Sequence, residues 1–131
     1  MSYLLGVQHV NLTIEEGPEA LEAARKFYVE VLGLEQLYRP ENTDNGRPGY
    51  WLGLGQSGQQ IHISAEPHAE GFNGPSRRHS AFLVTNLDEV VKRVQDGGYT
   101  IEAANQFPGQ RRSFCRDPFG NKLELVELTE D

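Results

Sequence analysis

Residues 50–64, YWLGLGQSGQQIHIS, align without a gap with residues 112–126, RSFCRDPFGNKLELV. At this offset of 62 positions (112 − 50), His62 corresponds to Glu124, and the isoleucines beside His62 correspond to leucines beside Glu124. Alternation of apolar and polar residues in both places is the period of a strand with one buried face. The two stretches therefore predict that one structural unit occurs twice in this chain.

A predicted helix precedes each of the two stretches. The first helix begins at the Gly-Pro pair of residues 17–18, because proline is favoured in the first helical turn, and Gly33 ends it. The second begins at Asn86, with Glu89 in the capping-box position, and the glycines at 97–98 end it. Apolar residues recur at helical spacing within both segments.

Strand-like runs surround the helices in the same order in both halves. They are residues 4–14, 34–39, 50–54 and 60–65 in the first half, and residues 79–85, 99–103, 111–116 and 122–128 in the second. The order strand, helix, strand, strand, strand, written twice, predicts an α+β fold of two tandem βαβββ modules. We expect a single domain over residues 1–131, with module one at about residues 1–66 and module two at about residues 76–131.

The charge balance of the chain is acidic. Its 131 residues include 12 Lys and Arg and 19 Asp and Glu, which gives a formal net charge of −7. A nucleic-acid-binding protein usually carries a basic face, and an anionic membrane surface attracts basic segments. The acidic balance therefore argues against both nucleic acid and membranes as partners.

The single cysteine, Cys115, excludes an internal disulfide and a thiolate-rich zinc site. A free thiol is typical of a reducing compartment, and we expect Cys115 to pack within a strand rather than to act as a nucleophile. No apolar window is long enough to span a membrane, and the first residues lack the basic region of a signal peptide. We therefore expect a cytoplasmic protein.

Strand alternation places four possible metal ligands on one face of the predicted sheet. His9 points away from Val10, His62 points away from the isoleucines beside it, and Glu124 points away from the leucines beside it. His79 opens the first strand of the second half, where it corresponds to His9. We predict that these four side chains share the concave side of the sheet.

Three imidazoles and one carboxylate suit a divalent ion such as zinc, iron, nickel, cobalt or manganese. Four protein ligands leave open positions on a five- or six-coordinate ion, where a substrate oxygen can bind. The sequence therefore predicts a site for one divalent metal ion, with His9, His62, His79 and Glu124 as its ligands. The remaining histidine, His68, lies in a glycine-containing loop, where we expect it to be solvated.

The sequence resembles the vicinal oxygen chelate superfamily of glyoxalases, fosfomycin- and bleomycin-resistance proteins and extradiol dioxygenases. The resemblance covers essentially the whole chain and rests on Gln8-His9-Val10, on Phe27-Tyr28 followed by Leu32-Gly33-Leu34, on His79, and on Asp117-Pro118-Phe119-Gly120-Asn121 before Leu123-Glu124-Leu125. It implies paired βαβββ modules that form a cupped mixed sheet around a divalent metal, with helices on the outer face. It also implies a homodimer, because in several members the cup combines modules from two chains.

The resemblance assigns the four predicted ligands individually. His9 matches the first-strand ligand of the family, His79 matches the first ligand of the second module, and Glu124 matches the carboxylate of the last strand. His62 falls where glyoxalases carry a carboxylate and methylmalonyl-CoA epimerases carry a glutamine. This departure separates the chain from a standard glyoxalase site.

The function implied by the resemblance is that of a metal-dependent lyase or isomerase acting on a small molecule with vicinal oxygens, with Glu124 or His62 as the catalytic base. An extradiol-type dioxygenase is an alternative, because His9, His79 and Glu124 have the composition of its iron triad. A second alternative is a small-molecule binding protein of the bleomycin- or fosfomycin-resistance type. Bleomycin-resistance proteins have generally lost the ligands that this chain keeps.

Further pocket residues follow from the predicted hairpins. The Asp-Pro-Phe-Gly sequence at 117–120 predicts a turn between the last two strands. If both hairpins keep the same register, Trp51 lies on the side of His62 and Ser113 lies on the side of Glu124. Phe72 in the glycine-rich loop either covers the cup or is a mobile aromatic residue on the surface. Four arginines form either a local positive patch or solvated strand edges: Arg39, Arg47, Arg111 and Arg112.

Overall fold

The computed structural model describes residues 2–67, 73–74 and 76–130 of the chain. His68 and Phe72 therefore lie outside the described residues. The elements in chain order are β1 (His9–Ile14), α1 (Pro18–Arg25), the π-helical segment η1 (Lys26–Val31), β2 (Glu35–Leu37), the 3-10 turn η2 (Thr43–Gly46), β3 (Gly49–Gly53), β4 (Gln60–Ala65), β5 (His79–Leu83), α2 (Leu87–Asp96), β6 (Ile101–Glu102), β7 (Gln110–Arg116) and β8 (Lys122–Leu128).

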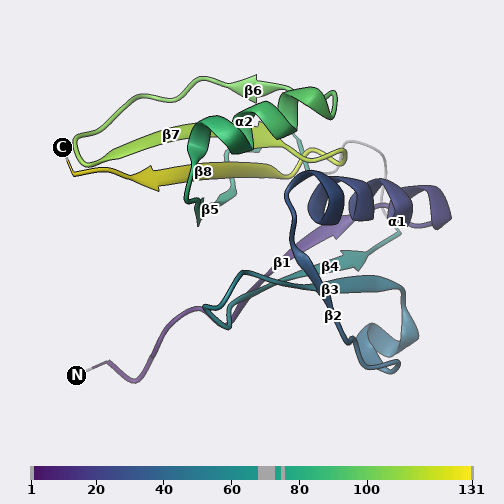
Figure 1. The fold of residues 1–131 in the computed structure, drawn as a ribbon. Helices are drawn as coiled ribbons and strands as arrows, with labels where there is room; N and C mark the ends of the chain where they lie inside the picture. Colours follow the sequence, from purple (N-terminus) through teal and green to yellow (C-terminus); the bar gives the residue numbers. More distant parts are fainter. Residues whose placement is uncertain (1, 68–72, 75, 131) are drawn as a thin grey trace.

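The strands form two mixed sheets with the same topology. Each is four-stranded, in the orders β1-β4-β3-β2 and β5-β8-β7-β6. In each sheet the first strand pairs in parallel with the last, and the other pairs are antiparallel. The duplicated βαβββ order and the α+β class are thus confirmed. Figure 1 shows the two sheets as separate bodies, so the cup is not closed within this chain.

The helices begin and end where their local chemistry predicts. Pro18 occupies the first turn of α1, and the side chain of Asn86 accepts a hydrogen bond from the backbone N–H of Glu89 at the start of α2. The first helix continues beyond Arg25 as the π-helical segment η1, and Gly33 follows it with φ of 78°. A positive φ is open to glycine at little cost, which explains why the helix ends there.

The first strand is shorter than its apolar sequence predicts. We expected a strand over residues 4–14, whereas β1 begins at His9, opposite Gln60 at the start of β4. Gln8 still accepts a hydrogen bond from Gln60 at the start of β4, but further upstream no described strand lies alongside, and Leu4 and Leu5 remain 86% and 99% exposed. In Figure 1 this N-terminal segment extends away from the first sheet.

The two β-hairpins differ in length by one residue, which changes the register of the repeat. Gly53 pairs with Gln60 across a loop of six residues, 54–59, whereas Arg116 pairs with Lys122 across five, 117–121. Trp51 therefore lies opposite His62, as expected, but Phe114 rather than Ser113 lies opposite Glu124. The prediction for Ser113 is wrong, because a one-residue shift reverses every side chain of a strand.

The two modules share one apolar core. Ile14, Phe27 and Tyr28 of the first module belong to the same buried cluster as Val94 and Leu123 of the second. Cys115 is also fully buried in this cluster, which agrees with a packing role.

Polar contacts fix the junction between the modules. The Tyr28 hydroxyl donates to Asp117 Oδ2 over 2.6 Å, and the Arg93 guanidinium of α2 donates to the carbonyl oxygens of Glu30 and Val31 at the end of η1, both over 2.7 Å. A guanidinium at a helix C-terminus satisfies carbonyl groups that have no partner within the helix.

Among the described helices, none has the length and apolar character needed to cross a membrane.

Candidate functional site

His79 and Glu124 face each other on the open side of the second sheet. His79 begins β5, Glu124 lies in the middle of β8, and the two strands are parallel neighbours. His79 Nε2 lies 3.0 Å from Glu124 Oε1, and the two side chains are 34% and 12% exposed. The site is thus partly shielded from water but open to a ligand on the side of His79.

A backbone carbonyl orients the His79 ring. His79 Nδ1 lies 2.9 Å from the carbonyl oxygen of Arg77, which can only accept a hydrogen bond, so Nδ1 carries a hydrogen. Nε2 then faces Glu124 Oε1 in one of two ways. A hydrogen on Nε2 would join the two groups in a hydrogen bond, and a lone pair there would let both groups bind one cation.

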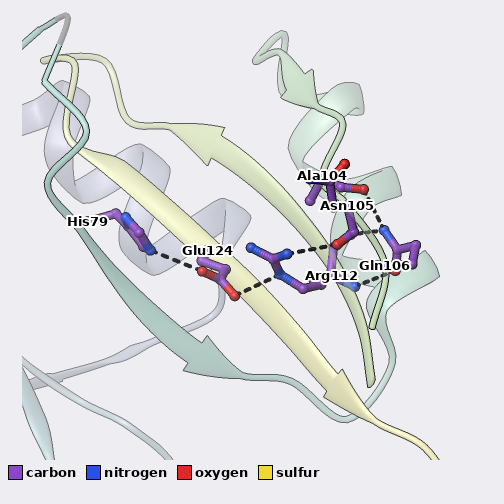
Figure 2. A network of polar contacts seen from close by, with 6 residues as sticks. All are labelled: His79, Ala104, Asn105, Gln106, Arg112 and Glu124. Atoms are coloured by element: carbon purple, nitrogen blue, oxygen red, sulfur yellow. Dashed lines mark hydrogen bonds and ion pairs between the residues drawn. The ribbon is translucent and has the colours of Figure 1, made fainter. Parts of the chain in front are cut away.

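The other oxygen of Glu124 is held by Arg112 (Figure 2). Arg112 Nε donates to Glu124 Oε2 over 3.0 Å, and Arg112 Nη1 donates to the carbonyl oxygen of Asn105 over 2.7 Å. Gln106 Oε1 accepts the backbone N–H of Arg112, which ties the connecting segment to β7. A carboxylate with a fixed orientation is characteristic of metal ligands, whose supporting hydrogen bonds hold them in place.

Three of the four arginines are paired with carboxylates rather than forming a free positive patch. Arg39 pairs with Asp44, Arg111 pairs with Asp88, and Arg112 pairs with Glu124. The Arg112 and Glu124 side chains are each 12% exposed, so Arg112 is not a solvated residue at a strand edge. Its role was not apparent from the sequence, because Arg111 and Arg112 are adjacent and only the register places Arg112 on the face of Glu124.

Phe114 supports the same face of the second sheet. Its ring meets the His79 ring edge-on, with the ring centres 5.5 Å apart, and the Lys122 ammonium lies 4.2 Å from the centre of the Phe114 ring. A cation over an aromatic face is attracted by the ring quadrupole. Phe114 therefore occupies the position beside Glu124 that the simple register predicts for Ser113.

His9 and His62 lie together on the open face of the first sheet, stacked with Trp51. The His9 and His62 ring centres are 3.9 Å apart with 16° between the ring planes, and the Trp51 and His62 centres are 4.4 Å apart with 5°. All three rings line a pocket of about 410 Å³ in the first module. A metal ion lies in the plane of an imidazole ligand, so stacked rings do not converge on one ion.

The surroundings of the His62 imidazole favour its neutral form. Burial, followed by the neighbouring His9 and Arg39, lowers the pKa of His62, while Asp44 acts in the opposite direction. His62 Nε2 lies 2.8 Å from Gln60 Oε1, an acceptor, so the hydrogen is on Nε2 and the lone pair is on Nδ1. A neutral imidazole with a free lone pair can accept a proton.

The η2 turn forms the rim of this first pocket. Asp44 and Asn45 both adopt left-handed backbone conformations, with φ of 51° and 57°. Such residues cost free energy and persist where neighbouring groups hold them. Here Asp44 Oδ2 accepts hydrogen bonds from Arg39 over 3.0 Å and from the Ser64 hydroxyl over 3.2 Å.

The structure therefore brings the predicted ligands together as two pairs, His9 with His62 and His79 with Glu124. Within the part of the chain that the structure describes, no group of three His, Cys, Asp or Glu side chains is placed to hold one metal ion. Of the two pairs, His79 with Glu124 has the donor atoms better suited to a metal ion. His79 Nε2 and Glu124 Oε1 are 3.0 Å apart, and an imidazole with a carboxylate suits a borderline divalent ion.

The family model of the Glyoxalase/Bleomycin resistance protein/Dioxygenase superfamily matches residues 7–125. The chain belongs to this superfamily. No curated protein matches the chain. A structure of a Bacillus anthracis protein assigned to the glyoxalase family is 33% identical, covers 98% of this chain and 99% of its own length, and has a TM-score of 0.84.

Two more distant structures share the superfamily fold. One is a mutant of the fosfomycin resistance protein FosX from Listeria monocytogenes, complexed with Mn(II) and 1S,2S-dihydroxypropylphosphonic acid. It is 18% identical, covers 97% of this chain and 93% of its own, and has a TM-score of 0.73. The other is lactoylglutathione lyase from Agrobacterium tumefaciens, which is 22% identical, covers 96% of each chain and has a TM-score of 0.67.

Proposed function

We propose that this glyoxalase-superfamily protein is a divalent-metal-dependent lyase or isomerase that acts on a small molecule with vicinal oxygens. The proposal is based on two donor atoms that face each other, His79 Nε2 and Glu124 Oε1, which are 3.0 Å apart. Both side chains are also held from behind, because His79 Nδ1 donates to the carbonyl oxygen of Arg77 and Glu124 Oε2 accepts from Arg112. Imidazole and carboxylate suit borderline divalent ions. The FosX structure, which holds Mn(II), supports a divalent ion in a protein of this fold.

We propose further that the protein is a homodimer and that His9 of the partner subunit supplies the third ligand. Within one chain His9 lies with Trp51 and His62 in a different pocket from His79. A two-fold dimer that places the first sheet of one chain against the second sheet of the other would join the two pairs. Exposed apolar side chains support a covered surface, since Leu83 and Leu128 are 72% and 65% exposed.

Subunit complementation tests the shared site. His9→Ala and Glu124→Gln chains each lack one ligand in every site of their homodimers, so we expect little metal in either. Dissociated and reassociated together, they form heterodimers in which one of the two sites is intact, so about a quarter of the wild-type metal content and activity should return. A site built within one chain gives no recovery, and that result would refute the shared site.

His62 is the proposed proton acceptor. Glu124 already contacts His79 and Arg112 with its two oxygens, whereas the His62 Nδ1 lone pair has no hydrogen-bond partner among the described residues. A divalent ion at the site would act as a Lewis acid that stabilises negative charge on the substrate oxygens. In the dimer, His62 Nδ1 would take a proton from the substrate carbon and return it to the neighbouring carbon in an isomerisation.

Separate readouts distinguish a base from a ligand. His62→Ala should abolish deuterium exchange from D₂O into the hemithioacetal of methylglyoxal and glutathione, while Mn(II) affinity changes little. His79→Ala should lower both the deuterium exchange and the Mn(II) affinity. Equal losses of exchange and of metal affinity in His62→Ala would make His62 a ligand.

Catechol-dependent oxygen uptake by the anaerobically Fe(II)-loaded protein would assign extradiol dioxygenase activity instead.

A second candidate function is binding of an aromatic small molecule without turnover. The Trp51, His62 and His9 rings form a stack beside a pocket of about 410 Å³, and flat aromatic ligands stack on such rings. Under this proposal, ligand affinity survives removal of metal by EDTA and is lost in Trp51→Ala. For the metal-dependent enzyme, EDTA removes activity, and Trp51→Ala changes substrate affinity more than it changes metal content.

A further inference from the structure

A second pocket lies between the two modules, directly beside His79. It has a volume of about 310 Å³ and is lined by residues of β1, of β5 and of the start of β8, together with residues of the connecting segments. It shares Asn11 with the pocket of the first module, so the two pockets adjoin along β1. This position places the second pocket within reach of a substrate held at His79.

The lining of this pocket presents hydrogen-bond donors and positive charge. Arg78 and Lys122 line it, and no described lining residue is acidic. Arg78 uses Nε to bind the Ser76 hydroxyl, which leaves its two terminal nitrogens as donors. The Asn11 side chain accepts from the Ser64 hydroxyl through Oδ1, so its amide nitrogen is also a donor.

The charge of the pocket is opposite to that of the chain. The net charge is −7, and Arg25, Arg39, Arg111, Arg112 and Arg116 are each paired with a carboxylate. Arg78 and Lys122 form no ion pair with any carboxylate of the described residues. The Lys122 ammonium is held over the Phe114 ring, 4.2 Å from its centre, which fixes the charge without neutralising it.

We infer that this pocket binds an oxyanion, a phosphonate, phosphate or carboxylate group, through Lys122 and Arg78. Two cations and additional N–H donors along one pocket match the charge and the acceptor oxygens of such groups. The inference rests on the proposed function in one respect, namely that the oxyanion is part of the substrate whose vicinal oxygens lie near His79. The substrate class is then an anionic small molecule, despite the acidic charge of the whole chain.

Methylphosphonate and acetate are suitable probes, with neutral dimethyl methylphosphonate as the uncharged control. Binding to the protein is followed by NMR through the side-chain amide of Asn11, after EDTA has removed any metal and has itself been dialysed away. We expect saturable binding of at least one anion, with the better probe identifying the oxyanion, and no binding of the neutral ester. Lys122→Gln and Arg78→Gln should each weaken binding by about tenfold, because each removes one charge-assisted hydrogen bond.

Matched controls separate this pocket from general charge effects. Arg77→Gln changes the exposed neighbour of Arg78, and Arg47→Gln changes a cation of the first pocket, so both should leave affinity within about twofold. Equal weakening in all four variants, or unchanged affinity in both Lys122→Gln and Arg78→Gln, would overturn the inference. Anion binding that requires added Mn(II) would also overturn it.

Separate measurements of metal binding and of anion binding distinguish a failure of the proposed metal site from a failure of the oxyanion pocket. If the wild-type protein binds no divalent metal, yet binds methylphosphonate or acetate in a Lys122-dependent manner, the proposed metal chemistry falls and the oxyanion pocket stands. If Mn(II) binds through His79 and Glu124 but no probe anion binds, the oxyanion pocket falls alone. Thermal unfolding of each variant confirms that a loss of binding does not reflect a loss of fold.

Discussion

Arg112 on β7 and Glu124 on β8 form an ion pair across the open face of the second sheet, with Nε and Oε2 3.0 Å apart and both side chains 12% exposed. The far end of the guanidinium is fixed as well, because Nη1 donates to the carbonyl oxygen of Asn105. A guanidinium anchored on both sides allows the carboxylate one orientation, with Oε1 directed at His79. Arg112 therefore positions Glu124 through its contact with Oε2, and Oε1 is left to contact His79.

This arrangement predicts that Arg112→Lys weakens divalent metal binding by about 10- to 100-fold, because supporting hydrogen bonds of ligands typically have effects of this size. Lysine keeps the charge but loses the planar fork that reaches both partners. Competition between the protein and a chromophoric chelator for Zn(II) measures the change. The control is Arg111→Lys, which alters the adjacent residue in an exposed pair with Asp88. Equal effects of the two variants would contradict a positioning role for Arg112.

Tyr28→Phe is expected to loosen the junction between the modules. The variant removes the 2.6 Å hydrogen bond to Asp117 Oδ2, while Asn121 Nδ2 still donates to the same oxygen over 2.8 Å. We expect a decrease of about 1–2 kcal/mol in the free energy of unfolding, measured by urea denaturation. Tyr99→Phe is a suitable control, because no hydrogen bond of the Tyr99 hydroxyl to a described residue is present. A smaller loss of unfolding free energy in Tyr28→Phe than in Tyr99→Phe would contradict a stabilising role for the Tyr28–Asp117 hydrogen bond.

Gly49→Ala should destabilise the first sheet. A Cβ at Gly49 would lie 2.1 Å from the carbonyl oxygen of Ile63, and backbone cannot move aside without disturbing the β3–β4 pair. We expect a loss of about 3 kcal/mol or more in chemical denaturation, at the upper end of overpacking effects. Gly53→Ala is the matched substitution in the same strand, where the nearest atom is a Leu37 methyl at 3.4 Å. It should cost less than about 1 kcal/mol.

Cys115 should be unreactive in the folded protein. Burial, followed by the charges of Asp117 and Glu102, raises the pKa of the Cys115 thiol from 9.0 to about 12. At pH 8.5 the native thiol remains protonated, so iodoacetamide should label it only after unfolding in guanidinium. Rapid labelling of the native protein at that pH would show that the strand opens.

The same thiol makes stability depend on pH. Between pH 9 and about 12 the unfolded chain loses the thiol proton while the folded chain keeps it, so the free energy of unfolding falls as pH rises. The denaturation midpoint of the wild type should therefore decrease more between pH 9 and pH 10.5 than that of Cys115→Ala. Identical slopes for the two proteins would contradict the burial effect.

The module order was predictable because its signals are local. Pro18 and Asn86 mark helix starts through contacts within one turn, and Gly33 ends a helix through its own φ of 78°. Strand boundaries depend on partners instead. The apolar residues 4–8 resemble a strand, yet β1 begins at His9, where β4 provides a neighbour.

The side-chain environment of the site was predictable in part. Alternation along each strand placed His9 and His62 on one face of the first sheet, and the pairing of Trp51 with His62 agrees with the simple register. The same reasoning failed for Ser113, because one residue fewer in the second hairpin loop moves Phe114 to that place. Loop length sets register, and the apolar pattern of β7 is too weak to reveal the shift.

The amino-acid sequence by itself determined the duplicated βαβββ order, the α+β class and the faces that carry His9, His62, His79 and Glu124, because periodicity and caps act between near neighbours in the chain. Tertiary structure alone decided that these residues form two separate pairs, that Arg112 holds Glu124, and that Arg78 and Lys122 line one pocket beside His79. Those contacts join segments far apart in the chain, and their distances depend on how strands pair and how the two sheets pack.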